Sequence, residues 1–385
     1  MRIGMISDTL YKQGKGTGQS RYLSNILAYL RDLDKENEYV LFHKDPSPNP
    51  LYGVYEDVEY GRYSSRLHLP FFISWEVAFA KALRSNPMDL VFEPACVGLP
   101  LLSIPPRNAV TLMDVMANLF PRRFALKGVT EFRSRLPAVL WKTDIVIAPS
   151  ENSSRDIQKV FPWTTGKVRV IPLGLTPDFG RRSEKDVDAV LENLGINRPY
   201  VLMHAVHRWN KNTPGAVRIF RLAVDISGSK EHQLVLSGGM RPGFEAEVRE
   251  LVKKEGMTDR TVLTGFVDDD EVPALISGAT AFLYPAFYEG FGFPVLEAMT
   301  CGAPVVASSI PTTIEVLGDA GLTAAAEDEE SLARHLASVM MDAGLASTSG
   351  ARALERSKEF TAERMVRKTV EVFREVLERP PRWQV

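Results

Sequence analysis

The sequence predicts an α/β fold of two domains, each built on a parallel β-sheet covered by helices. The chain has 385 residues, which is more than one hydrophobic core usually accommodates. Short apolar runs of strand length alternate with segments of helical periodicity along most of the chain. Because this alternation is typical of parallel sheets with helices on both faces, we expect two such sheets in succession.

Composition excludes several functional classes. The 46 basic and 48 acidic residues give a net charge of −2, so no global charge attracts nucleic acid. Cys96 and Cys301 are the only cysteines and lie far apart in apolar surroundings, so we expect a reducing cytoplasm, no disulfide and no cysteine metal site. No leader precedes the first strand, and no apolar stretch approaches the ~18 residues that span a bilayer. We therefore expect a cytoplasmic protein, at most peripheral at the inner face of the membrane.

The first half of the chain contains five apolar runs that predict strands, at 3–6, 39–42, 90–92, 109–112 and 145–148. A glycine loop at 14–18 follows the first strand, but it lacks the spacing of a dinucleotide or P-loop motif. A flexible turn is an equally good interpretation of that loop. Asp114 follows the 109–112 strand, where open α/β sheets bind ligands. Capping of the next helix is the alternative role for this carboxylate.

The segment 119–142 is locally basic. Between Pro121 and Lys142 it carries six basic residues against the single acidic Glu131, interleaved with aromatic and leucine side chains. Such a segment suits contact with an anionic membrane or a phosphorylated lipid acceptor. A solvated helix with one apolar stripe is the simpler interpretation.

The second half begins after a charged, linker-like stretch at 176–198 and continues with strands at 200–203, 233–236, 261–264, 281–283 and 305–308. The loop after the 200–203 strand carries His204, His207, Arg208 and Lys211. A lysine and an arginine there would stabilise negative charge on a diphosphate without a metal. Exposed loop cations are the alternative. The two histidines lack an evident third ligand, so ordinary polar contacts are expected of them rather than a metal.

The stretch 287–306 combines a glycine loop, a short helix and a strand directly after the 281–283 strand. Gly290 and Gly292 allow a sharp turn, and Pro294 suits the first helical position. Free N–H groups before a helix N-terminus attract phosphate. The carboxylates of Glu289 and Glu297 accept hydrogen bonds, as sugar and ribose hydroxyls require. A solvated turn residue and a helix-start charge are the alternative interpretation.

These residues resemble a known family motif. Tyr288–Pro294, Leu296–Met299, Cys301-Gly302 and Pro304–Val306 are similar to the Glu-x7-Glu motif of retaining glycosyltransferases of family 4. The resemblance implies the GT-B fold, in which two Rossmann-like domains face each other across a cleft. It also implies a nucleotide-sugar donor at the carboxyl ends of the second domain's strands.

The chain departs from the family pattern at three places. Met113 precedes Asp114 where the family usually has histidine, so a histidine role does not carry over. Ala205 replaces the glycine that usually follows the first strand of the second domain. Asn210 stands where an arginine is expected before the lysine, and Arg208 is the candidate substitute.

The resemblance implies a role for each domain. Residues 1–176 would bind the acceptor, 177–362 the donor, and the helix in 363–385 would cross back to the first domain. Glu289 would hold the sugar hydroxyls and Glu297 the ribose, while Arg208 and Lys211 would face the diphosphate and Asp114 the acceptor or sugar hydroxyls. The further candidate donor-binding residues are Gly290, Phe291, Gly292, Phe293, Gly238, Gly16 and Gly18.

The resulting hypothesis is a retaining, metal-independent hexosyltransferase of polysaccharide biosynthesis. It needs no cofactor beyond its nucleotide-sugar co-substrate, and its acceptor is a glycan, a lipid-linked molecule or a small molecule. GDP-mannose is favoured because the residue pattern of 288–306 resembles that of bacterial mannosyltransferases. Two alternatives remain open: a nucleotide-sugar epimerase of the same fold, and a non-catalytic protein that binds sugar nucleotides.

Overall fold

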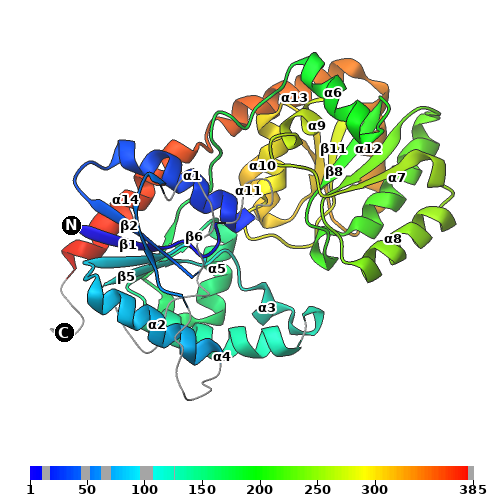
Figure 1. Ribbon diagram of the computed structural model, residues 1–385. Helices are drawn as coiled ribbons and strands as arrows, with labels where there is room; N and C mark the ends of the chain where they lie inside the picture. Colours follow the sequence, from blue (N-terminus) through cyan, green and yellow to red (C-terminus); the bar gives the residue numbers. More distant parts are fainter. Residues whose placement is uncertain (11–17, 45–52, 62–70, 96–106, 125, 380–385) are drawn as a thin grey trace. The chain divides into compact units, whose positions relative to one another are not determined.

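The computed structural model describes residues 1–10, 18–44, 53–61, 71–95, 107–124 and 126–379. The chain divides into two compact units, one formed by Met1–Gly174 with Ala362–Val385 and one by Leu175–Thr361. Each unit contains a single parallel β-sheet flanked by helices (Figure 1). The predicted α/β fold with parallel sheets is therefore confirmed.

The first unit is built on seven parallel strands in the order β3-β2-β1-β4-β5-β6-β7. Their bounds are β1 Arg2–Ile6, β2 Glu38–His43, β3 Glu56–Glu59, β4 Leu90–Glu93, β5 Asn108–Thr111, β6 Ile145–Ala148 and β7 Val168–Val170. The central strands β4, β5 and β6 are buried along their whole length. A strand covered on both faces needs a continuous apolar run, which explains why the sequence revealed them.

The helices of the first unit are α1 Gly18–Leu33, α2 Phe71–Ser85, α3 Met116–Leu119, α4 Leu126–Lys142, α5 Glu151–Val160 and α14 Ala362–Glu378, with short 3-10 turns η2 Pro121–Arg123 and η3 Pro162–Thr164. Ser150 caps α5 by accepting a hydrogen bond from the Ser153 N–H at 3.0 Å. No helix in the described residues is long and apolar enough to cross a membrane.

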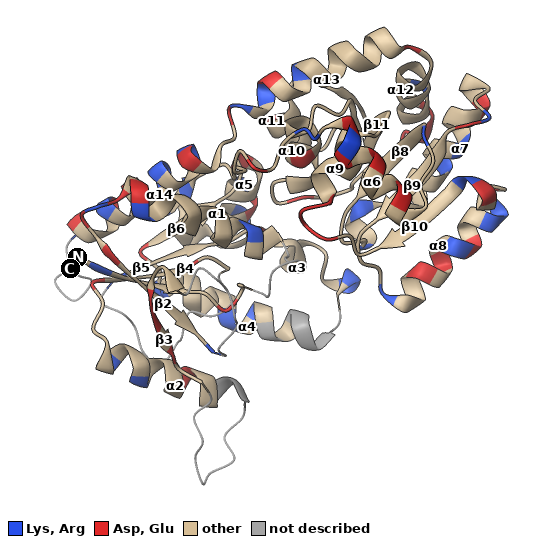
Figure 2. Ribbon diagram, turned by 45° about the horizontal axis from the view of Figure 1, so that its top comes forward, with Lys and Arg blue, Asp and Glu red and all other residues tan. Residues whose placement is uncertain are grey.

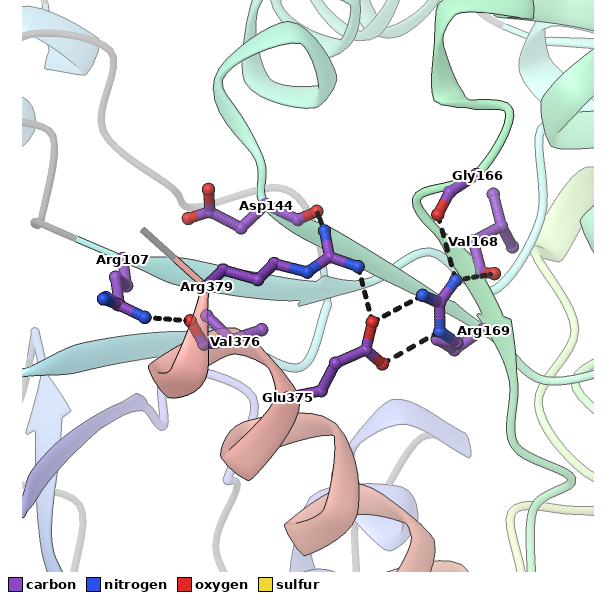
Figure 3. Close-up of polar contacts among 8 residues, drawn as sticks. All are labelled: Arg107, Asp144, Gly166, Val168, Arg169, Glu375, Val376 and Arg379. Carbon is purple, nitrogen blue, oxygen red and sulfur yellow. Dashed lines mark hydrogen bonds and ion pairs between the residues drawn. The ribbon is translucent and has the colours of Figure 1, made fainter. Parts of the chain in front are cut away.

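The C-terminal helix α14 belongs to the first unit, where it packs on α1, β4 and β5. The buried Phe373 meets Phe92 of β4 edge-on, with ring centroids 5.1 Å apart. Figure 3 shows that Glu375 lies between Arg169 and Arg379 and forms ion pairs with both. Arg107 donates to the carbonyl of Val376, near the end of the helix (Figure 3). These contacts fasten the far end of the chain to the sheet.

The second unit is built on six parallel strands in the order β10-β9-β8-β11-β12-β13. The strands are β8 Tyr200–His204, β9 Gln233–Ser237, β10 Thr261–Gly265, β11 Ala281–Tyr284, β12 Val305–Ser308 and β13 Leu322–Ala324. The helices are α6 Glu184–Leu194, α7 Thr213–Ser227, α8 Pro242–Lys254, α9 Val272–Ser277, α10 Phe293–Thr300, α11 Pro311–Leu317, α12 Glu329–Met341 and α13 Ala343–Ser357, with 3-10 turns η4 Trp209–Lys211 and η5 Thr258–Arg260. Alternating charges mark the outer helices α8 and α14 (Figure 2).

Three edge strands, β3, β7 and β13, were not predicted from the sequence, and β7 has only three half-buried residues. β3 has the sequence Glu-Asp-Val-Glu, and its charged residues are exposed. β13 has three residues, all only half-buried. Because edge strands are short and face solvent, they lack the apolar run that identifies a central strand.

Candidate active site

The strand order of the second unit places one pair of loops side by side. β8 and β11 are neighbours in the sheet, and the strand order runs outward in opposite directions from this pair. At such a switch point the loops after the two strands diverge and leave a crevice at the carboxyl edge of the sheet. The loop after β8 contains residues 205–212, and the loop after β11 contains residues 285–292. Most of the candidate donor-site residues lie on these two loops.

The loop after β11 runs directly into helix α10. Gly292 is the N-cap of this helix and has φ 98°, a conformation that favours glycine. Pro294 is the second helical residue, one position later than predicted, because Phe293 already has helical geometry. Gly302 follows the helix with φ 70°, as predicted. The helix N-terminus therefore lies at the carboxyl edge of the sheet, beside Glu289.

Lys211, Glu289 and Tyr284 form a buried cluster at this edge. The Lys211 ammonium forms an ion pair with the Glu289 carboxylate and donates a hydrogen bond to the Tyr284 hydroxyl at 2.8 Å. The Tyr284 hydroxyl in turn donates to Glu289 Oε1 at 2.8 Å. The side chains of Lys211 and Glu289 are only 15% and 11% exposed, so water screens their attraction weakly.

Tyr284 remains a hydrogen-bond donor throughout the working pH range. Burial raises the pKa of the Tyr284 phenol well above its ordinary value, and the nearby charge of Glu289 raises it further. A neutral phenol donates one hydrogen bond and accepts others, which matches its contacts with Glu289 and Lys211. Tyr284 therefore bridges the cation and the carboxylate.

Asn210 joins the two loops that carry the ion pair. Its backbone carbonyl accepts a hydrogen bond from the Phe287 N–H at 2.7 Å, and its side-chain amide donates to the Tyr288 carbonyl at 3.0 Å. The same amide lies 3.5 Å from Glu289 Oε1. The residue that departs from the family's arginine is thus a buried connection between η4 and the 285–292 loop.

His207 holds the β8 loop against the end of β9. Its Nε2 lies 2.9 Å from the Ser237 carbonyl and its Nδ1 lies 2.8 Å from the Thr213 hydroxyl. Since a carbonyl only accepts, Nε2 carries the proton and Nδ1 accepts from Thr213. Burial and, to a smaller extent, the charge of Lys211 together lower the pKa of His207 to about 4, although the hydrogen bond to the Ser237 carbonyl acts in the opposite direction. The imidazole is therefore neutral at pH 7.

His204, at the end of β8, and His207, in the following loop, both contact other protein groups. Both ring nitrogens of His207 have partners, and Nδ1 of His204 lies 3.1 Å from the Ser237 hydroxyl. Among the residues that the structure describes, no three His, Cys, Asp or Glu side chains come together as metal ligands would. These histidines therefore connect the end of β8 and its loop to Ser237 and Thr213.

Gly238 allows the loops after β8 and β9 to approach each other closely. It has φ 114°, and a Cβ atom at this position would lie 1.9 Å from the carbonyl oxygen of Ala205. Ala205, in contrast, is outside the left-handed region, where Asn212 is the one described residue other than glycine. The alanine at 205 is therefore compatible with the fold, and Gly238 provides the close approach.

The remaining candidates of the second unit lie on the same two loops or in α10. Arg208 is exposed and immediately precedes η4. Glu297 is buried within α10, at 3% exposure, so it is not a solvated helix-start charge. Phe291 is also buried, and its ring contacts those of Phe293 and Phe360. Gly290 is buried in the same loop.

The other candidates belong to the first unit, which is built on the seven-stranded sheet. Asp114 follows β5 and accepts a hydrogen bond from the Met116 N–H at 2.8 Å. The N-cap of α3 is Val115, not Asp114. Gly18 is the exposed first residue of α1 rather than part of a preceding loop. Gly16 lies outside the described residues.

Sequence reasoning missed Tyr284 and gave Asn210 only as a departure. Tyr284 directly follows the 281–283 run that predicted β11 and is the last residue of that strand, where an aromatic side chain resembles one more core residue. The feature that could have identified it is a hydroxyl at the carboxyl end of a buried strand, directly before the motif that contains Glu289. The role of Asn210 depends on a contact with residues 77 and more positions away, which spacing does not reveal.

Comparison with known proteins identifies similar sequences. Residues 187–356 match the family model described as "Glycosyl transferases group 1". The chain is 28% identical over 270 residues to O-antigen chain mannosyltransferase B of Escherichia coli, covering 70% of each protein. It is 22% identical over 286 residues to the serotype-specific mannosyltransferase WbdA of Escherichia coli, and spans about a third (35%) of that protein's length.

The fold is also similar to solved structures. Anabaena HepE in complex with UDP and glucose superposes with a TM-score of 0.75 at 19% identity, over 97% of this chain and 100% of that one. At this level of identity the likeness concerns the fold alone. Together with the two parallel sheets it confirms the predicted GT-B fold.

Proposed function

We propose that this chain is a glycosyltransferase that moves mannose from GDP-mannose to a hydroxyl of a growing polysaccharide, with retention of configuration. Support comes from the match of residues 187–356 to the model "Glycosyl transferases group 1" and from the two parallel sheets. The observation that carries the proposal is the buried Lys211–Glu289–Tyr284 cluster at the switch point of the second sheet. The mannose donor and the polysaccharide acceptor are supported by the names of the similar proteins, above all O-antigen chain mannosyltransferase B.

In this proposal the donor binds at the carboxyl edge of the second sheet. Glu289 accepts hydrogen bonds from the sugar hydroxyls, and the buried Glu297 accepts those of the ribose. Lys211 and Arg208 stabilise the charge that develops on the departing diphosphate, together with the N-terminus of α10. These groups supply positive charge without a metal ion, and no protein nucleophile is assigned.

The cluster explains how Lys211 and Glu289 are kept ready for a ligand. Lys211 has three N–H donors, of which Glu289 and Tyr284 receive two. The third is suited to a phosphate oxygen. Tyr284 and Asn210 hold the Glu289 carboxylate in place, so its other lone pairs are oriented toward a sugar.

The first unit provides the acceptor site in this proposal. Asp114 is the candidate for contacts with acceptor or sugar hydroxyls, and Gly16 and Gly18 are candidates for contacts with the donor phosphates or the acceptor. The acceptor is a glycan, lipid-linked or free, and a peripheral membrane contact through 119–142 would bring the enzyme to a lipid-linked acceptor.

A thermal-shift screen tests the donor. GDP, UDP and ADP, each alone and with its common sugars, are added to the full chain at saturating concentration. A ligand at ~100 times its Kd stabilises by about 2.7 kcal/mol, so the correct base gives a clear rise in Tm. GDP and GDP-mannose are expected to raise Tm, while a rise with UDP or ADP and none with GDP contradicts the proposed donor. A donor whose sugar changes configuration without an acceptor would indicate an epimerase instead.

A further inference from the structure

Four polar side chains meet at the carboxyl edge of the first sheet, and none of them has a part in the proposed transfer. Asp8, Lys44 and Tyr60 follow β1, β2 and β3, and Glu93 is the last residue of β4. These strands are consecutive neighbours in the order β3-β2-β1-β4. Because the carboxyl ends of parallel strands share one edge, these residues form one group, the edge cluster, although they are distant in the chain.

The edge between β1 and β4 is the switch point of this sheet. The strand order runs from β1 to β3 in one direction and from β4 to β7 in the other. Met5 of β1 pairs with Phe92 of β4. Glu93 therefore stands beside the end of β1, where the loop that carries Asp8 begins. In open α/β sheets, ligands bind at the carboxyl edge of such a switch point.

Three members of the edge cluster hold one another in place. The Tyr60 hydroxyl donates to Asp8 Oδ2 at 2.5 Å, and the Lys44 ammonium pairs with the same oxygen at 2.9 Å. The indole N–H of Trp75 in α2 donates to the Tyr60 hydroxyl at 3.0 Å. The Lys44 ammonium also lies over the Trp75 ring, 4.3 Å from its centroid. This network fixes the Asp8 carboxylate and balances its charge.

Glu93 is the member of the edge cluster whose hydrogen bonding is incomplete. The residue is 2% exposed, and its Oε1 accepts a hydrogen bond from the Ala95 N–H at 2.9 Å. Its Oε2 is buried and has no hydrogen-bond partner among the described residues. A buried polar atom of this kind requires an explanation, because nearly all such atoms in folded proteins have a partner.

The Glu93 carboxyl is a hydrogen-bond donor at pH 7. Burial and, to a smaller extent, the charge of Asp8 raise its pKa to about 8, although the hydrogen bond from Ala95 and the charge of Lys44 act in the opposite direction. The carboxyl is therefore mostly protonated. Since Oε1 accepts from a backbone N–H, the proton lies on Oε2, the oxygen without a partner.

The charges near Glu93 favour an uncharged ligand. The Lys44 ammonium already faces the Asp8 carboxylate, and Arg135 of α4 pairs with the buried Glu76 of α2 at 2.8 Å. Each of these two cations thus has a carboxylate partner. A phosphorylated ligand would have to compete with these carboxylates for the cations, whereas a neutral ligand would not.

Given a glycan acceptor, on which the proposed function depends, we propose that Glu93 donates a hydrogen bond from Oε2 to a hydroxyl of an uncharged sugar at the end of that acceptor. A buried O–H group without an acceptor costs free energy, and a sugar hydroxyl can accept from it. Asp114 follows β5, the next strand after β4 in the sheet, and is the candidate for other hydroxyls of the same sugar.

An NMR titration of the full chain with a mannan oligosaccharide, without nucleotide, tests the proposal. The wild type is expected to bind. Glu93→Met replaces the carboxyl with an apolar side chain and should weaken binding on the order of tenfold, because the ligand hydroxyl loses its partner. Glu93→Gln keeps an acceptor for Ala95 and a donor in place of the Oε2 hydroxyl, so it should bind within about threefold of the wild type.

Asn108→Ser is the matched control. Asn108 is also buried, and its Oδ1 likewise has no partner in the part of the chain that the structure describes, but it lies at the amino edge of the same sheet. This variant should bind the oligosaccharide as the wild type does. Thermal unfolding shows whether each variant is folded. Glu93→Val, with a side chain that suits a strand, gives the same comparison if Glu93→Met is unfolded.

Four results would overturn the proposal: no binding by the wild type, unchanged binding by Glu93→Met, a loss in Glu93→Gln equal to that in Glu93→Met, or tighter binding of a phosphorylated oligosaccharide. Failure of the proposed function is separable, because no nucleotide is present in this titration. If the oligosaccharide binds through Glu93 but no nucleotide raises Tm, the sugar site stands and the proposed transfer fails. If a nucleotide raises Tm but the oligosaccharide does not bind, the sugar site alone fails.

Discussion

At the scale of single residues, the site is organised by a phenol that spacing arguments overlook. An ion pair as buried as Lys211 and Glu289 loses hydration, and its attraction compensates only if the remaining donors and acceptors are satisfied. Tyr284 meets this need by accepting from Lys211 and donating to Glu289. We therefore regard Tyr284 as a positioning residue for both charged groups.

Tyr284→Phe should slow transfer with little effect on the fold. The change removes the hydrogen bonds of the hydroxyl to Lys211 and to Glu289. Each bond to a charged group is worth about 1.5–3 kcal/mol, so we expect a kcat at least ~10-fold lower. Steady-state kinetics with a saturating donor measures the effect. Tyr200→Phe is the matched control, because that buried hydroxyl donates to the Leu275 carbonyl away from the ion pair. The control should lower the stability by about 1 kcal/mol and leave kcat unchanged.

The burial of His207 predicts a pH dependence of stability. Its folded pKa of about 4 lies below the ordinary value of 6.5, so between these pH values only the unfolded state binds the proton. The contribution of the neutral His207 to the free energy of unfolding should thus be fully present above pH 6.5. It should fall by about 3 kcal/mol as the pH decreases to 4. Urea titrations across this range measure the slope.

His207→Gln should flatten this slope without removing it. His232 contributes a smaller part in the same direction, because burial and then Arg260 lower its pKa as well. A slope identical to that of the wild type would show that His207 does not remain neutral in the folded protein.

At the scale of elements, the sequence predicted the helices, strands and turns that have a local residue pattern. It did not predict contacts between segments that are distant in the chain. The buried strands, the Gly292 turn, helix α10 and Gly302 follow from apolar runs, glycine and proline positions. The edge strand β3 and the connection made by Asn210 do not, because an edge strand lacks apolar alternation and the partner loops of Asn210 are distant in the chain. The motif at 287–306 could therefore be predicted from the sequence as one segment. The contacts that the 205–212 loop makes with it became visible only in the structure.

The approach of the loops after β8 and β9 can be tested with adjacent glycines. Gly238→Ala places a Cβ atom against the Ala205 carbonyl at a positive φ, so the β8 loop must move. We expect a loss of several kcal/mol in stability, on the order of other strained or overpacked sites, and weaker nucleotide binding. Gly239→Ala meets no atom within 4 Å and should resemble the wild type. Calorimetry and nucleotide titration of both variants give the comparison.

At the scale of the whole molecule, the chain forms two units, and the first unit combines the N-terminal and C-terminal parts of the sequence. Helix α14, at the C-terminal end of the described chain, completes the core of the first unit through Phe373 and the Glu375 ion pairs. The Lys211–Glu289–Tyr284 cluster, in contrast, lies entirely within the second unit. Damage to one core should therefore leave the other largely intact.

Phe373→Ala should destabilise the first unit selectively. Removing a fully buried phenylalanine costs about 3–5 kcal/mol, and its partner Phe92 lies in β4. Hydrogen exchange should show lost protection in β4 and β5 with retained protection in β8 and β11. Phe220→Ala, at a fully buried residue of α7, should give the opposite pattern. Uniform loss across both units in either variant would contradict the two-unit description.

The transfer reaction itself tests the proposed donor site without an intermediate assay. GDP-mannose labelled in the sugar is incubated with the full chain and a mannan oligosaccharide, and NMR determines the anomeric configuration of the transferred mannose. We predict a product with the configuration of the donor, and with Glu289→Gln a rate at least ~10-fold lower, since this carboxylate contacts both Lys211 and Tyr284. A product of inverted configuration, or an unchanged rate in the variant, would contradict the assignment of the Lys211–Glu289–Tyr284 cluster as a retaining donor site.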